Sequence, residues 1–179
     1  MNKLISGALL VIAVATLFAF STTDASAQEK QKYSFKAPAG VTKYGEQHAI
    51  DVGDVPGHQL RVYETHSTYT GEAPVYDGVK VKEGWTRAVS DYTDGTGRGS
   101  GYGISILENG DKIFSRFELT TQTSVAADGS KTTKAYSVAT LTGGTGKFKG
   151  IHGTLRGVTA TDFKTLSGAE TEGEYWIER

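Results

Sequence analysis

The stretch Leu141 to Val158, L-T-G-G-T-G-K-F-K-G-I-H-G-T-L-R-G-V, carries six of the 23 glycines in the chain. Glycine adopts positive φ without strain and lets two backbones approach closely, so this density predicts a sharp turn between two β-strands. Phe148 is expected to fill apolar volume at that turn. The glycines assigned to it are Gly143, Gly144, Gly146, Gly150 and Gly153, and Gly144 and Gly146 are expected to need positive φ.

The same glycines fit the phosphate-binding loops of nucleotide-binding proteins poorly. A dinucleotide loop needs G-x-G-x-x-G at the start of an amphipathic helix, whereas here the third glycine comes one residue late and a β-rich segment follows. A Walker loop needs serine or threonine after Gly-Lys, but Phe148 follows Gly146 and Lys147. The stretch therefore predicts a structural turn rather than a phosphate site.

The run from Gly143 to Gly153 resembles the G-G-T-G-x-F-x-G-x-x-G signature of the allene oxide cyclase and dirigent-like β-barrels. Residues 77–178 are also similar to secreted bacterial proteins of this type, in Y-D-G-V-K-V, L-E-N-G-D-K-I-F and E-G-E-Y-W-I-E. The resemblance implies one closed antiparallel barrel of about eight strands. It also implies an apolar ligand cavity and a homo-oligomer, and it assigns no catalytic residue to this chain.

The first residues have the pattern of a secretory signal peptide. A short basic start precedes the apolar run Leu4 to Phe20, and Ala25-Ser26-Ala27 is a small-x-small cleavage site. The alternative is a membrane anchor, because an apolar run of this length is near the lower limit for a spanning helix. We favour cleavage before Gln28 and a periplasmic or secreted protein. The absence of cysteine excludes a disulfide framework and a lipid-anchored lipobox.

Composition and charge favour a single all-β domain after that cleavage. Lysine and arginine number 19 against 20 acidic residues, interspersed along the chain, so nucleic acid and anionic membrane surfaces are not expected partners. Threonine, glycine, tyrosine and valine are abundant, as in β-proteins. We expect a signal peptide at 1–27, a loose N-terminal arm at 28–57 and a β-barrel domain at 58–179.

Alternating apolar and polar residues predict the strands of that barrel. Asp94-Gly95, Asn109-Gly110 and Asp128-Gly129 are expected to form hairpin turns. The last strand ends in the aromatic run from Glu174 to Ile177 and is expected to close the barrel. The predicted strands cover 59–69, 79–92, 99–108, 112–124, 131–141, 151–161 and 168–178.

The candidate catalytic residues share strand faces with apolar neighbours. They are Glu64 and His66 on one predicted strand and Arg87 and Asp91 on the next. A carboxylate or histidine held among apolar groups acquires a shifted pKa and can act as an acid or a base. The alternative is a solvent-facing ladder of ion pairs, which we favour because buried charges are costly unless paired. The candidate ligand-binding residues are Tyr102, Trp85 and Phe117.

No motif of metal or nucleophilic chemistry accompanies these residues. The four histidines lack metal-ligand spacing and no serine lies in a G-x-S-x-G elbow, so no metal and no cofactor is expected. Three functions remain, and whether the protein is an enzyme stays open. We favour a barrel that binds a small hydrophobic or aromatic ligand. The alternatives are a cyclase, isomerase or dirigent-like protein that steers a reactive intermediate, and a structural envelope protein with a filled core.

Overall fold

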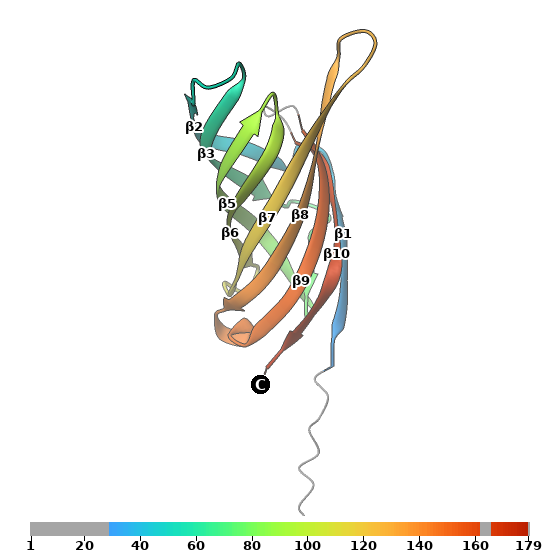
Figure 1. The fold of residues 1–179 in the computed structure, drawn as a ribbon. Coiled ribbons are helices and arrows are strands. Elements are labelled where there is room, and N and C mark those ends of the chain that lie inside the picture. Colours follow the sequence, from blue (N-terminus) through green and yellow to red (C-terminus); the bar gives the residue numbers. More distant parts are fainter. Residues whose placement is uncertain (1–28, 162–165, 179) are drawn as a thin grey trace, which may run out of the picture.

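A computed structural model describes residues 29–161 and 166–178, which form β-strands and one short 3-10 helix, η1 (Figure 1). The predicted signal peptide lies outside the described residues. Within them, no helix is long and apolar enough to cross a membrane. The elements are β1 Gln31–Ala37, β2 Thr42–Asp51, β3 His58–Thr68, β4 Val75–Tyr76, β5 Val79–Thr93, β6 Thr96–Leu107, β7 Lys112–Val125, β8 Lys131–Gly144, η1 Gly146–Phe148, β9 Ile151–Thr161 and β10 Leu166–Ile177.

The strands form one antiparallel sheet with the order β1-β10-β9-β8-β7-β6-β5-β3-β2, and β4 pairs with β5. The all-β prediction is confirmed. The seven predicted strands correspond to β3 and β5 to β10, with ends that differ by at most three residues. The Asp94-Gly95 turn joins β5 to β6 with φ of +50° and +79°, the positive values that a two-residue hairpin requires.

The segment predicted to be a loose arm supplies both edge strands of the sheet, which corrects that prediction. β1 pairs along its whole length with β10, and its Tyr33 and Ala37 side chains are buried. β2 pairs with β3, and its ladder is interrupted by a bulge between Tyr44 and Gln47. A short strand and a bulged strand carry too little uninterrupted alternation for the sequence pattern to reveal them.

The sheet is strongly curled, because its two edges are consecutive in sequence (Figure 1). Residues 38–41 alone join β1 to β2, so these strand ends lie at most roughly 18 Å apart. A flat sheet of nine strands would separate its edges by roughly 38 Å. No backbone ladder joins β1 to β2 within 29–161 and 166–178, so the closed barrel is confirmed only as a curled antiparallel sheet. The aromatic strand β10 lies between β9 and β1 rather than at an edge.

The glycine turn and η1 seal one end of the curled sheet. Phe148 and Ile151 are fully buried there and pack with Leu107. Gly146 has φ of +51°, as predicted, whereas Gly144 does not have positive φ. A Cβ on Gly144 would lie 2.4 Å from the carbonyl oxygen of Lys112, so close backbone approach is the reason for that glycine.

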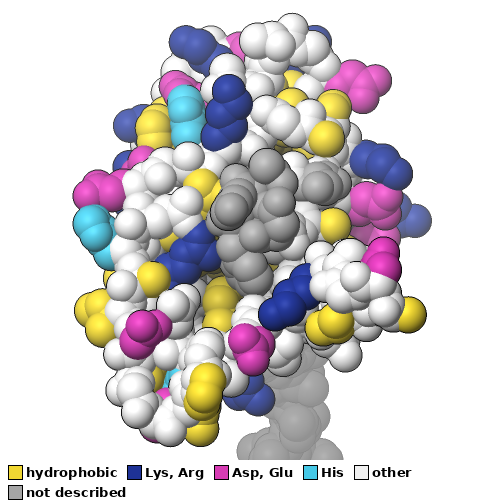
Figure 2. All heavy atoms as spheres, turned by 90° about the horizontal axis from the view of Figure 1, so that it is seen from above, with side chains coloured by type: hydrophobic (Ala, Val, Ile, Leu, Met, Phe, Trp, Pro, Cys, Tyr) yellow, Lys and Arg dark blue, Asp and Glu magenta, His cyan; other side chains and the backbone are white. Residues whose placement is uncertain are grey.

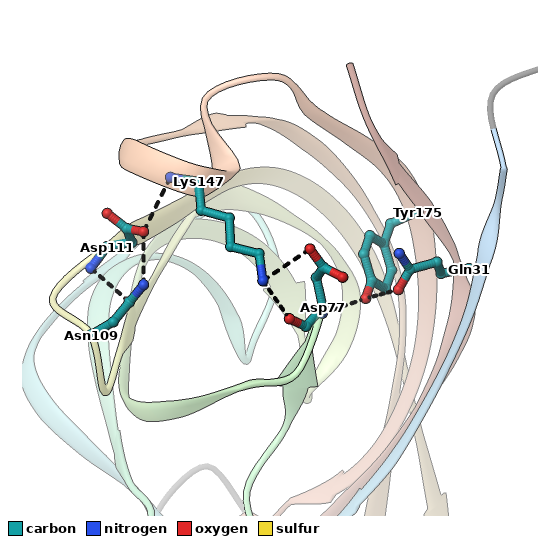
Figure 3. Close-up of polar contacts among 6 residues, drawn as sticks. All are labelled: Gln31, Asp77, Asn109, Asp111, Lys147 and Tyr175. Atoms are coloured by element: carbon teal, nitrogen blue, oxygen red, sulfur yellow. Dashed lines mark hydrogen bonds and ion pairs between the residues drawn. The ribbon is translucent and has the colours of Figure 1, made fainter. Parts of the chain in front are cut away.

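Side chains hold the β4–β5 hairpin against the opposite edge of the sheet at this sealed end (Figure 3). The backbone N–H of Asp77 donates to the Tyr175 hydroxyl at 2.7 Å, and that hydroxyl donates to Gln31 Oε1 at 2.6 Å. Lys147 of η1 reaches Asp77 Oδ2 at 3.0 Å and its carbonyl oxygen at 2.7 Å. Tyr76 stacks on Tyr33 of β1 with ring centroids 4.9 Å apart. These contacts join the β4–β5 hairpin to β1, β10 and η1 without a backbone ladder.

Candidate functional site

The inward face of each strand follows from side-chain alternation, except where a bulge shifts it. On β3 the inward residues are Arg61, Tyr63, Thr65 and Ser67. On β5 the ladder to β6 shifts between Val81 and Glu83. Because one extra residue reverses the face of every later side chain, the residues beyond that bulge that face inward are Gly84, Thr86, Ala88, Ser90 and Tyr92.

The inward faces surround a cavity of about 350 Å³. Aromatic rings line it mainly on the side of β1 to β5, with one more on β7, and mostly small or hydroxylated side chains line it on β8, β9 and β10. The cavity exists because these small residues leave space opposite the rings. Its aromatic residues are Tyr33, Phe35, Tyr44, Tyr63, Tyr69, Tyr76, Tyr92 and Phe117; its small residues include Ala135, Ser137, Ala139, Gly157, Thr159 and Thr171.

Five tyrosines of the cavity are neutral phenols near neutral pH: Tyr33, Tyr63, Tyr69, Tyr76 and Tyr92. Burial raises the pKa of Tyr33 to about 12. Burial also raises the pKa values of Tyr63, Tyr69, Tyr76 and Tyr92. Such phenols donate and accept hydrogen bonds near neutral pH but do not act as bases. The rings therefore provide apolar contact and neutral hydrogen-bonding groups.

Arg61 is the single charged side chain among the described residues that line the cavity. Its guanidinium carbon lies 5.1 Å from the ring centroid of Tyr44 and 5.4 Å from that of Tyr63. Both distances are within the range of cation–π contact. Figure 2 views the molecule from the end opposite η1 and shows both lysine or arginine side chains and hydrophobic side chains exposed at this end.

The structure places the predicted catalytic residues on the outer face of the sheet. Arg87 Nη2 lies 2.8 Å from Glu64 Oε2, and His66 Nε2 lies 2.9 Å from Glu83 Oε2. Asp91 Oδ1 lies 2.7 Å from His58 Nε2. These contacts are the ion-pair ladder that we favoured from the sequence. The acid–base alternative loses its basis, because none of the four candidate side chains lines the cavity.

The predicted ligand-binding residues are divided between the two faces. Phe117 lines the cavity. Tyr102 is 66% exposed on the outer face. Trp85 follows the β5 bulge, points outward and stacks on His66 with ring centroids 3.9 Å apart. The bulge is the physical reason that the face of Val79 and Val81 does not continue through Trp85 and Arg87.

Sequence reasoning identified Phe117 but missed other residues that define the cavity. Tyr33 and Tyr44 lie in the segment predicted to be a loose arm, so they were not considered. Arg61 and Tyr63 were on the predicted strand, but its alternation did not say which face points inward. The signal that could have identified them was the concentration of tyrosine at alternate strand positions. A tyrosine ring that lies opposite glycine or serine leaves space in the interior of a curled sheet.

The outer face carries a second, open groove of about 1140 Å³. Ile50, Leu60, Val62, Val89, Val138 and Val158 contribute exposed apolar surface to it. Arg98 and Glu118 also line the groove, as do Arg156 and Glu172. This groove is larger than the cavity and mixes apolar side chains with both signs of charge, and Arg61, Leu119, Ser137 and Gly157 belong to the lining of both.

No group of three or more potential metal-ligating side chains is positioned to hold a metal ion in the described part of the chain. Comparisons of the chain with protein-family models, curated proteins and solved structures found no match. The function is therefore argued from the cavity and its lining.

Proposed function

We propose that this is an exported protein that binds a small hydrophobic or aromatic ligand inside its curled sheet. The observation that carries the proposal is the cavity of about 350 Å³ lined by aromatic rings. Its volume lies within the usual range of small-molecule sites, and its mixture of apolar surface with a few polar groups is typical of them. Affinity comes mainly from apolar contact, at about 25 cal/mol per Å² buried before the costs of association.

The lining favours binding over catalysis. General acid–base chemistry needs a group whose pKa lies near the working pH, and burial raises the pKa values of the cavity phenols of Tyr33, Tyr63 and Tyr76 far above it. The carboxylates and histidine that could serve such chemistry, Glu64, Asp91 and His66, are engaged on the outer face. The open interior volume also favours a ligand over a structural role with a filled core.

We place the protein with the allene oxide cyclase and dirigent-like barrels on the resemblance of residues 143–153. The four-residue connection between the two edge strands supports a barrel-like enclosure. At the sealed end, the contacts of Asp77, Lys147 and Tyr175 hold the wall together where backbone pairing is missing.

The binding proposal is tested with a neutral aromatic probe, 2-naphthamide, by isothermal titration calorimetry. Ala139 lines the cavity, and its neighbour Val138 is 48% exposed on the outer face. Ala139→Phe places a ring in the cavity and is expected to abolish binding, whereas Val138→Phe adds the same ring outside and leaves binding unchanged. Absence of binding to the unmodified protein, or equal binding by both variants, would refute the proposal. Thermal unfolding of each variant confirms that it is folded.

Export is tested separately by intact mass spectrometry of the protein from its source. We expect a mature chain that begins at Gln28. Recovery of the full chain in the membrane fraction, with residues 4–20 retained, would instead support a membrane anchor.

A further inference from the structure

The wall around the cavity has a line that no backbone ladder crosses. From β1 through β10 and onward to β2, each strand is hydrogen-bonded to the next along its backbone. Within 29–161 and 166–178, no such ladder joins β1 to the segment 69–76, which follows β3 and lies across from β1. We call this line the seam. Opening the wall between paired strands would break several main-chain hydrogen bonds at once, whereas the seam can open by separation of side chains.

Two pairs of aromatic residues lie across the seam, and they are packed differently. Tyr33 stacks on Tyr76, and these residues are only 8% and 4% exposed. Phe35 meets Tyr69 edge to face, with ring centroids 5.7 Å apart. Both residues of this second pair line the cavity and are only partly buried. The Phe35–Tyr69 pair is therefore the less tightly packed part of the seam.

Polar contacts hold the seam closed at its end nearest η1. The backbone N–H of Asp77 donates to the Tyr175 hydroxyl, which donates to Gln31, and these bonds fix the first residue of β1 beside the β4–β5 hairpin (Figure 3). Phe35 lies four residues farther along β1. The seam is therefore held by hydrogen bonds at one end and by a ring contact at the Phe35–Tyr69 pair.

Tyr69 begins the loop 69–74, which joins β3 to β4 without regular secondary structure. Its backbone N–H donates to the carbonyl oxygen of Lys82 at 3.1 Å, and its hydroxyl is hydrogen-bonded to Ser67. Lys82 and Ser67 lie on β5 and β3, on the same side of the seam as Tyr69. The Phe35 and Tyr69 rings can therefore separate without breaking either bond.

We propose that the ligand enters and leaves the cavity sideways, through the seam, and that the Phe35 and Tyr69 rings form its gate. The rings separate, the ligand passes between them, and they return to contact behind it. This inference rests on the proposed function of the cavity and adds its route of access. Because the rings are in contact in the closed state, the association rate is set by the fraction of molecules in which they are apart.

The test measures the association and dissociation rates of 2-naphthamide by stopped-flow fluorescence of its naphthyl group. Phe35→Ala removes one ring of the gate. The association rate constant is expected to rise by about two- to tenfold, the factor by which loss of an edge-to-face ring pair changes an opening equilibrium. Tyr69→Ala removes the other ring and is expected to act in the same direction. Phe35→Trp adds bulk at the gate and is expected to slow both association and dissociation.

Phe117→Ala is the matched control, because Phe117 lines the cavity from β7, in the middle of the sheet and away from the seam. Loss of a ring that only contacts the ligand should speed dissociation and leave the association rate constant unchanged. An unchanged association rate constant in Phe35→Ala, or the same rise in Phe117→Ala, would overturn the gate and leave the binding proposal intact. Failure of the unmodified protein to bind 2-naphthamide would overturn both.

Thermal unfolding shows which variants are folded. If the alanine variants at the gate are not, Phe35→Trp decides, because it keeps an aromatic ring in the seam. Slower association than in the unmodified protein supports the gate, and association that is equally fast or faster overturns it.

Discussion

The two faces of the sheet carry opposite kinds of chemistry. The inner face holds neutral phenols, hydroxyls and small residues around Arg61, whereas the outer face holds paired charges such as Glu64 with Arg87 and His66 with Glu83. Titratable groups attract attention in a sequence, but in this protein they lie where water solvates them. The difference teaches that a ligand site can consist of residues with unremarkable ionisation, recognised only by where they face.

The largest expected change in stability comes from comparing a charge placed on the inner face of β5 with a charge placed on its outer face. Val81 is 2% exposed and faces inward, and Val89 is 53% exposed and faces outward. Val81→Asp buries an unpaired carboxylate and is expected to lower the free energy of unfolding by about 3 kcal/mol or more. Val89→Asp is expected to change it by less than about 1 kcal/mol. Denaturant unfolding measures both, and similar losses would contradict the assignment of faces.

The next largest loss of stability is expected at the end of the curled sheet that the glycine turn and η1 seal. A side chain on Gly144 would collide with the carbonyl oxygens of Lys112 and Phe148, at 2.4 and 2.7 Å from its Cβ. Gly144→Val is therefore expected to cost about 2–4 kcal/mol of stability. Gly71 is the control, because a Cβ there meets nothing within 4 Å. Thermal unfolding distinguishes the two, and a stable Gly144→Val protein would show that this end is not tightly packed.

A smaller and pH-dependent effect is expected on the outer face at His58. Hydrogen bonds to Asp54 and then to Asp91 raise the pKa of the His58 imidazole. Its contribution to stability is fully present below the unfolded-state pKa of about 6.5 and disappears as pH rises through the raised folded-state pKa. His58→Gln is therefore expected to lower the melting temperature at pH 5.5 and to have little effect at pH 9. The opposite pH dependence would contradict the ion-pair assignment.

The smallest effect is expected for the Glu64–Arg87 pair. Arg87 is largely exposed, so Glu64→Gln should change stability by less than about 1 kcal/mol. It should also leave 2-naphthamide binding unchanged, because Glu64 does not line the cavity. Calorimetry and thermal unfolding check the two expectations. A loss of binding in Glu64→Gln would show that the outer face contributes to the site.

The strands and turns were predictable because they depend on local pattern. Alternation and the Asp94-Gly95 hairpin signal gave β3 and β5 to β10 with small errors at their ends. The face of Trp85 and Arg87 was not predictable, because the extra residue between Val81 and Glu83 has no distinctive sequence signal. β1 was missed for a related reason, since its strand character depends on a distant partner, β10.

The cavity depends on the same kind of long-range information. Tyr63 and Gly157 face the same interior from strands far apart in sequence, and neither residue alone indicates a void. The sequence could supply the aromatic and small residues but not their positions opposite one another. Likewise, the structure was needed to show that Arg61 lines the cavity.

The pairing of the first described strand with the last has a consequence for the order of folding. Gln31 of β1 lies opposite Tyr175 of β10, so these two strands pair although they are far apart in sequence. By contrast, each of the other long strands has a pairing partner that is close to it in sequence. Closing so long a loop is entropically unfavourable until the intervening strands are in place. β1 is therefore expected to dock last, and its amides should gain protection after those of β7 and β8 in pulsed hydrogen exchange during refolding. Early protection of β1 would contradict this order, under which the edge of β10 that pairs with β1 stays uncovered until β1 docks.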